Sequence, residues 1–91
     1  MQKQDILARV SQMEQYFDWL QDAAAINPAS VYQDGFLREI FEKLLDYSEN
    51  GQWLADYTAD EQGELPPDLK RGILSQDGLY NLLCEIEQYR E

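Results

Sequence analysis

Apolar side chains recur every three or four residues along the first part of the chain. The spacing is clearest in one series, Ile6, Val10, Met13, Phe17, Leu20 and Ala24. It places the series on one face of an α-helix. Asn27-Pro28 follows, and proline removes a backbone donor and biases the residue before it away from helical angles. The pattern therefore predicts a long helix over residues 3–26.

A second apolar stripe lies beside the first and consists of Tyr16, Trp19, Ala23 and Ile26. A wide apolar face is typical of a helix that is covered by the rest of its own domain, and we favour that interpretation. The alternative is that the second stripe is a contact surface for another copy of the chain or for a different protein.

The same spacing returns further along the chain at Leu37, Phe41 and Leu44, flanked by Ile40 and Leu45. Asn27 as N-cap and Pro28 at the first helical position can begin this helix, and Asn50-Gly51 can end it. Gly35 weakens its middle, so residues 29–35 are expected to be less regular. We predict a helix over about residues 28–50 that pairs with the first as an antiparallel hairpin.

Turn-forming residues crowd the segment of residues 56–78, which we call the connector. Trp53 and Tyr57, four residues apart, predict a short helical turn that Gly63 ends. Pro67 can begin a brief helix over residues 68–71, closed by Gly72. Ser75 then caps a last helix over residues 76–90, and Leu74 with Leu79 forms a hydrophobic staple that orients it. The inner face of this last helix carries Leu79, Leu82, Leu83 and Ile86.

These elements predict an all-α fold. We expect a small three-helix bundle, made of a long antiparallel helical hairpin plus a C-terminal helix, with an ordered Pro/Gly-rich connector. With 91 residues the chain is expected to form one helical domain over residues 1–91.

Composition restricts the partners of this domain. Hydrophobic residues make up 44% of the chain, which is too much for a disordered protein even at a net charge of −11. That charge repels phosphates and anionic membranes, so we expect no direct nucleic-acid binding and no membrane binding. No apolar run is long enough for a membrane span, the N-terminus lacks the apolar core of a signal peptide, and Cys84 is the only cysteine. We expect a cytoplasmic protein.

The sequence offers few residues that could form a catalytic or metal-binding site. The chain has no histidine, so Cys84 and the serines lack the usual base, and a zinc cluster cannot be assembled. An EF-hand fails because Pro67 or Leu69 falls where a bidentate acid is required. Two weaker alternatives are magnesium chemistry by Glu39 and Glu42, and a loose magnesium or calcium site through Asp56, Asp60, Glu61 or Glu64. We expect no enzyme activity, no cofactor and no metal.

The connector and its flanks carry a long sequence motif. It comprises Gly51, Trp53, Asp56, Ala59-Asp60-Glu61, Gly63, Leu65-Pro66, Asp68-Leu69-Lys70-Arg71-Gly72, Leu74-Ser75, Asp77, Tyr80 and Leu82-Leu83. In this motif the chain resembles a family of short bacterial proteins known as domain of unknown function 4298 (DUF4298). It departs from the family pattern at Ile73, where valine is expected, and at Gln76, where glutamate is expected. The resemblance implies an all-helical bacterial cytoplasmic protein and supplies no activity.

Candidate interaction residues are drawn from this motif and its surroundings: Trp53, Asp56, Tyr57, Asp60, Glu61, Lys70, Arg71, Asp77 and Tyr80. We expect Lys70 and Arg71 to pair with acids of the connector and with carbonyls at a helix C-terminus, and Arg71 suits a bidentate carboxylate contact better. The alternative is that this basic pair anchors an acidic group of a partner. Trp53 and Tyr57 are expected to pack against the hairpin rather than to form an exposed hot spot.

Two functions follow from these features. The leading hypothesis is a non-catalytic protein–protein interaction module, whose unknown protein partner is either a second copy in a homo-oligomer or a different protein. The alternative is an acidic inhibitor, of the immunity-protein or nucleic-acid-mimic type, that blocks a basic site on its partner.

Overall fold

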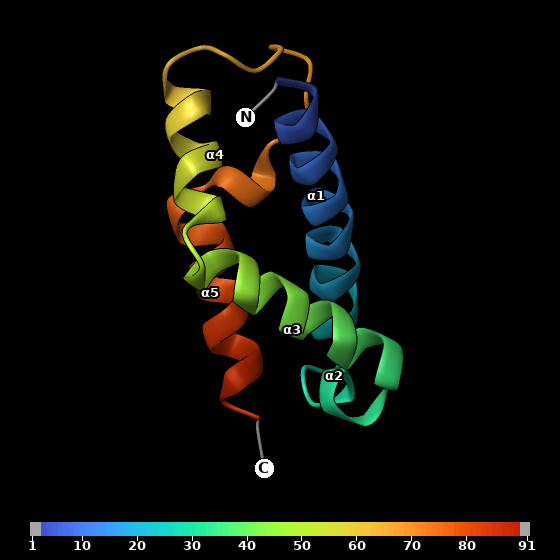
Figure 1. Cartoon of the computed structure of the whole chain (residues 1–91). Coiled ribbons are helices and arrows are strands. Elements are labelled where there is room, and N and C mark those ends of the chain that lie inside the picture. The colour runs from blue at the N-terminus through green and yellow to red at the C-terminus, as the bar shows by residue number, and fades with distance from the viewer. Residues whose placement is uncertain (1–2, 90–91) are drawn as a thin grey trace.

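The computed structural model describes residues 3–89, and every regular element within them is helical. The elements are α1 (Lys3–Ile26), α2 (Ser30–Gln33), α3 (Gly35–Glu49), α4 (Gln52–Glu61), the 3₁₀-helix η1 (Gly72–Leu74) and α5 (Gln76–Glu87). The predicted all-α class is therefore confirmed, and the helices form a small bundle (Figure 1). None of the helices in this part of the chain combines the length and apolarity needed to cross a membrane.

Helix α1 has the predicted bounds, residues 3–26. The first apolar stripe faces the bundle, where Val10, Phe17, Leu20 and Ala24 are buried. The second stripe is not covered in the same way, because Trp19 and Ile26 are exposed to solvent.

The second predicted helix is broken, and the break lies in the stretch expected to be less regular. Asp34 is extended, and its Oδ1 accepts hydrogen bonds from the backbone N–H groups of Phe36 at 2.9 Å and Leu37 at 3.1 Å. It is therefore the N-cap of α3, because an aspartate oxygen satisfies donors that the first helical turn leaves unpaired. The prediction that Asn27 caps a helix beginning at Pro28 is wrong. Asn27 Oδ1 instead accepts from Ala29 N–H in a turn, and α2 begins only at Ser30.

Helix α3 runs back obliquely across α1 (Figure 1). Its end is as predicted at Asn50-Gly51, where Gly51 has a φ of 92°. This left-handed conformation favours glycine and lets the chain turn directly into α4. Where the sequence predicts only a short turn around Trp53 and Tyr57, the structure has a ten-residue helix.

The loop of residues 62–71 crosses the end of the bundle from α4 to α1, and η1 then turns back between them (Figure 1). The brief helix predicted over residues 68–71 is absent from its expected place, and the 3₁₀ turn lies at Gly72–Leu74 instead. The Pro66 carbonyl accepts from Leu69 N–H at 3.2 Å in a single turn, and the Arg71 side chain binds the carbonyls of both residues, so the chain makes one turn here and no helix.

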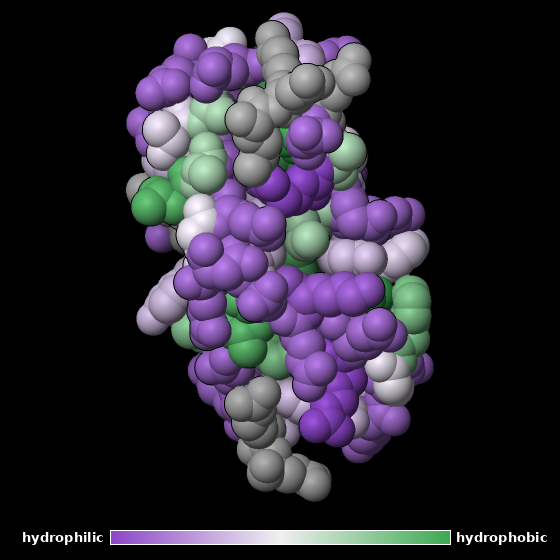
Figure 2. Space-filling view, viewed as in Figure 1, coloured by the Kyte–Doolittle hydropathy of each residue, from purple (hydrophilic) through white to green (hydrophobic). Residues whose placement is uncertain are grey.

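Helix α5 begins as predicted. Ser75 is its N-cap and accepts from Gly78 N–H at 3.3 Å, and Leu74 and Leu79 are both buried as the staple requires. The helix ends at Glu87, and the remainder of the predicted span reaches Arg90, which lies outside the described residues. One apolar cluster joins α5 to the other elements: Val10, Phe17, Leu20, Ala24, Val31, Ile40, Phe41, Leu44, Tyr47, Leu65, Ile73, Leu74, Leu79, Leu82, Leu83 and Ile86. Hydrophilic residues cover most of the face shown in Figure 2, with small hydrophobic patches between them.

Candidate functional site

Asp56 is the most enclosed charge among the described side chains, at 0% exposure. Arg9 of α1 donates to both carboxylate oxygens, from Nε to Oδ2 at 2.9 Å and from Nη2 to Oδ1. Tyr47 of α3 donates its hydroxyl to Oδ2 at 2.7 Å. Burial and then this hydrogen bond raise the pKa of Tyr47, and the same carboxylate raises the pKa of Arg9 by its hydrogen bond. The three side chains join α1, α3 and α4 through one satisfied buried ion pair.

Arg71 attaches the 62–71 loop to the end of α4. Its Nη1 donates to Asp60, its Nη2 to the carbonyl of Pro66, and its Nε to the carbonyl of Leu69 at 3.2 Å. The predicted pairing of this arginine with a connector acid is confirmed, but the carbonyls that it binds belong to the loop and not to a helix C-terminus. Its contact to Asp60 uses one nitrogen and is not bidentate. A loop held by three such bonds has a defined path.

Lys70 does not pair with an acid of the connector, so that expectation is wrong. Its Nζ donates to Asp18 Oδ2 of α1 at 3.0 Å, and both side chains are well exposed. The hydrogen bond to Asp18 raises the pKa of Lys70, and the charge of Glu14 adds to the effect. The reason for the difference is the path of the loop, which crosses from α4 to α1 and brings Lys70 within reach of Asp18.

Trp53 and Tyr57 stack on one side of α4, with ring centroids 5.0 Å apart and planes 17° from parallel. Trp53 packs against the core, and its Nε1 donates to the carbonyl of Ile73 at 2.8 Å, which ties α4 to η1. The predicted packing role of Trp53 is confirmed. Both aromatic residues are half-buried, and a hydrogen bond to Glu61 one turn later raises the pKa of Tyr57.

The remaining predicted residues lie on α5. Asp77 is exposed in the first turn, where an acid interacts favourably with the helix dipole. Tyr80 is exposed beside Cys84, whose hydrogen bond raises the pKa of the tyrosine. The structure brings Asp60 to Arg71, and it brings Trp53 to Tyr57 and Tyr80, but the nine candidate residues do not form one site.

Two of the acids considered as metal ligands are engaged elsewhere. Asp56 is bound by Arg9 and Tyr47, and Asp60 is bound by Arg71. Across residues 3–89, no three His, Cys, Asp or Glu side chains gather in a way that could hold a metal ion.

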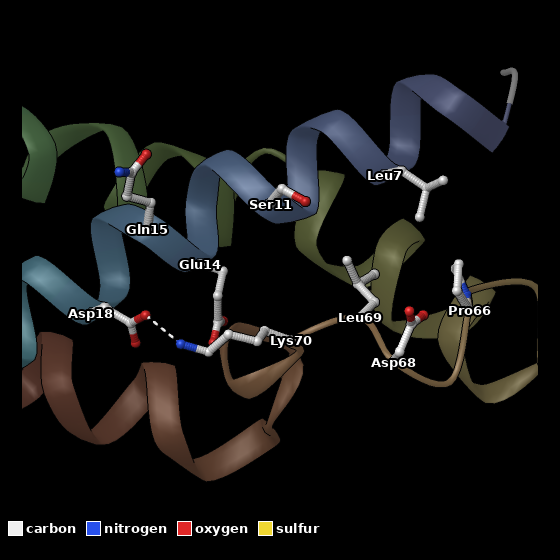
Figure 3. Close-up of a pocket in the computed structure, with 9 residues that line it drawn as sticks. All are labelled: Leu7, Ser11, Glu14, Gln15, Asp18, Pro66, Asp68, Leu69 and Lys70. Carbon is white, nitrogen blue, oxygen red and sulfur yellow. Dashed lines mark hydrogen bonds and ion pairs between the residues drawn. The ribbon is translucent and has the colours of Figure 1, made fainter.

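A groove of about 630 Å³ lies between the first half of α1 and the 62–71 loop (Figure 3). Helix α1 lines it with Leu7, Ser11, Glu14, Gln15 and Asp18. The loop lines it with Pro66, Asp68, Leu69 and Lys70. Figure 3 shows the carboxylates of Glu14 and Asp18 directed toward the loop, with Lys70 reaching Asp18.

Glu14 is only 6% exposed and was missed by sequence reasoning, as were Arg9, Asp18 and Tyr47. Its Oε2 accepts from the backbone N–H of Ile73 at 2.7 Å, so it fixes the position of η1. Gly72 permits this contact, because a Cβ there would lie 3.1 Å from Glu14 Oε1. A signal for Glu14 does exist: it stands four residues after Val10 and three before Phe17, within the apolar stripe.

Three aromatic rings form a second surface feature, which we call the aromatic ridge: Tyr16 and Trp19 of α1 and Phe36 of α3. Trp19 lies between the other two, with centroid distances of 6.2 Å to Tyr16 and 5.7 Å to Phe36. Trp19 is 39% exposed and Phe36 is 58% exposed. Lys43 Nζ lies 5.7 Å from the centroid of the Tyr16 ring. The second apolar stripe of α1 thus contributes two of the three rings.

Fold and contacts together define a small all-α bundle whose last helix is oriented by a loop bound to both α1 and α4. The chain belongs to the family described as domain of unknown function (DUF4298), whose model matches residues 11–90. The match confirms the resemblance seen in the motif around the connector. No curated protein and no solved structure matches the chain.

Proposed function

We propose that the protein is a non-catalytic protein–protein interaction module that binds its partner through the aromatic ridge. The observation that carries the proposal is the exposure of Trp19 and Phe36 in contact with each other, on a chain of net charge −11. Aromatic side chains supply much of the binding energy in protein interfaces because they bury large areas with few rotatable bonds.

The geometry of the ridge favours binding. Trp19 is held between Tyr16 and Phe36, and the three rings come from two different helices. Side chains that already contact one another lose less conformational freedom when a partner covers them. The engagement of Asp56 and Asp60 in ion pairs within the fold also supports a non-catalytic role, since they are two of the acids considered as metal ligands.

Affinity capture from the cell of origin tests the proposal, with the tagged chain as bait and Trp19→Ala/Phe36→Ala as the variant. Leu54→Ala is the matched control, since Leu54 is a 61% exposed apolar residue on α4. A captured protein is then purified and its affinity measured directly. We expect a loss of about 30-fold or more in the double variant, as for hot-spot residues, and little change in the control.

Light scattering on the purified chain tests whether the partner is a second copy of the chain. A dimer that dissociates in the double variant would identify the partner as the chain itself. A folded double variant that keeps full affinity for every partner, including a second copy, would show that the aromatic ridge is not the binding surface.

The second candidate is an acidic inhibitor that blocks a basic site on its partner. The net charge of −11 and the exposed acids on α1, α3, α4 and α5 favour it. This function requires strongly salt-dependent affinity and little sensitivity to Trp19→Ala/Phe36→Ala, because charge rather than apolar area would supply the binding energy. The same affinity measurements at two salt concentrations therefore separate the two functions.

A further inference from the structure

Glu14 is a buried carboxylate that interacts at a distance with the charge of Lys70 but forms no ion pair among the described residues. The ion pairs among the described residues join Arg9 to Asp56, Arg38 to Glu42, Lys43 to Glu39, Lys70 to Asp18 and Arg71 to Asp60, and none involves Glu14. Its Oε2 accepts from Ile73 N–H, and within residues 3–89 its Oε1 accepts no hydrogen bond. A buried charge of this kind is costly unless an opposite charge compensates it.

The groove beside Glu14 has the shape and charge for such a compensating group. Three acids, Glu14, Asp18 and Asp68, line it against one base, Lys70. Leu7 and Leu69 point into the same space from opposite sides (Figure 3). An occupant that matches both properties carries a cation on an aliphatic stem, as arginine and lysine side chains do.

We infer that the groove between α1 and the 62–71 loop receives a basic side chain, arginine above all, from an apolar segment of a protein partner. Arginine fits best because Glu14 Oε1 and the Asp18 carboxylate are both acceptors and a guanidinium presents several donors in a fixed plane. The inference deepens the proposed function by naming the chemistry of the partner, and it uses a different face of α1 from the aromatic ridge.

Lys70 already places a cation at one of the two acids. Its Nζ is bonded to Asp18 at 3.0 Å, and its exposed side chain lies across the groove (Figure 3). It is therefore an intramolecular competitor that a partner's arginine must displace. Because exposed ion pairs are weak, this displacement is easy, and removal of Lys70 should strengthen binding rather than weaken it.

A titration followed by ¹⁵N NMR tests the inference on the full chain. The probe is the capped peptide acetyl-Gly-Leu-Arg-Leu-Gly-amide, and its control is the same peptide with neutral citrulline in place of arginine. We expect saturable shifts of the amides of Ile73, Ser11 and Gln15 with the arginine peptide alone. Lys70→Gln should bind about two- to fivefold more tightly. Glu14→Gln keeps an acceptor for Ile73 N–H, and its affinity for the peptide should be lower by about tenfold or more.

Trp19→Ala should bind the peptide as the unchanged chain does, so this test stands apart from the test of the aromatic ridge. Equal binding of the arginine and citrulline peptides would overturn the inference. Amide shifts that do not saturate and that occur near all the acidic residues would also overturn it. So would equal shifts caused by spermidine at the same concentration of positive charge, or weaker binding of the arginine peptide by Lys70→Gln.

Discussion

Asp56 shows at the scale of a single residue how much of this fold depends on one carboxylate. It is fully buried and accepts from Arg9 and Tyr47, whose elements it joins to α4. Asp56→Asn keeps the shape of the side chain but removes the buried negative charge that Arg9 Nε and Nη2 bind. Breaking a buried pair in this way costs about 3–5 kcal/mol, a large part of the roughly 5–15 kcal/mol by which domains are stable.

Urea unfolding monitored by circular dichroism measures this loss. Glu42→Gln is the matched control, because its pairing with Arg38 at 3.6 Å is exposed and such pairs contribute about 0.5 kcal/mol or less. A loss below about 1 kcal/mol for Asp56→Asn would show that the ion pair contributes little beyond its hydrogen bonds.

The ionisation of Tyr47 should reduce the stability of the fold at alkaline pH. Its pKa is raised in the folded state by burial and by the hydrogen bond to Asp56. Above the ordinary tyrosine pKa of about 10, the unfolded chain releases this proton while the folded chain keeps it. The free energy of unfolding therefore falls as pH rises beyond that point, by about 1.4 kcal/mol per pH unit for one proton.

Urea unfolding at several pH values between 8 and 11 checks this slope. Tyr47→Phe should be less stable at neutral pH, since Asp56 loses a donor, and its stability should fall less steeply with alkaline pH. Tyr89→Phe is the control because Tyr89 is exposed. Identical alkaline slopes for the unchanged chain and Tyr47→Phe would contradict the assignment.

At the scale of elements, local signals were sufficient where a helix end is defined by its own residues. The end of α1 before Asn27-Pro28, the end of α3 at Asn50-Gly51 and the start of α5 after Ser75 lie close to the predicted positions. The length of α4 was underestimated, because the helix is stabilised by the contact of Asp56 with Arg9, 47 positions away. Glu14 and Ile73, 59 positions apart, are a similar case. Spacing in the sequence carries no information about such pairs, so the polar contacts that position the groove could not be predicted.

Arg71 provides a test of whether the 62–71 loop orients α5. Arg71→Ala removes the bonds to Asp60 and to the carbonyls of Pro66 and Leu69. We expect a loss of about 1–3 kcal/mol in the free energy of unfolding, since the contacts are partly exposed. Hydrogen exchange at the Ile73 amide should also accelerate more than exchange in α3, because η1 follows the loop directly.

Arg38→Ala is the matched control for Arg71→Ala, as the ion pair that Arg38 forms among the described residues is exposed and lies one helical turn along α3. Unchanged exchange at Ile73 in a folded Arg71→Ala variant would mean that Glu14 and Trp53 hold η1 in place without the loop.

At the scale of the whole molecule, the net charge of −11 is confined within principal extents of 39 × 24 × 21 Å. At about 0.01 M salt the Debye length of about 30 Å is comparable to these dimensions, so the acids repel one another across the bundle. At about 0.15 M salt it falls to about 8 Å, and only near neighbours interact. The buried Arg9–Asp56 pair is screened much less, so added salt removes mainly the unfavourable interactions.

Raising NaCl from 0.01 M to 0.15 M should therefore raise the Tm, measured by differential scanning calorimetry. Each kcal/mol gained corresponds to about 4–8 °C for a domain of this size. Replacing the exposed acids Glu49, Glu64, Glu85 and Glu87 by glutamine brings the net charge from −11 to −7, and it should raise the Tm at low salt and flatten its salt dependence. A Tm that falls with salt would mean that favourable ion pairs such as Lys70–Asp18 outweigh the repulsion among the acids.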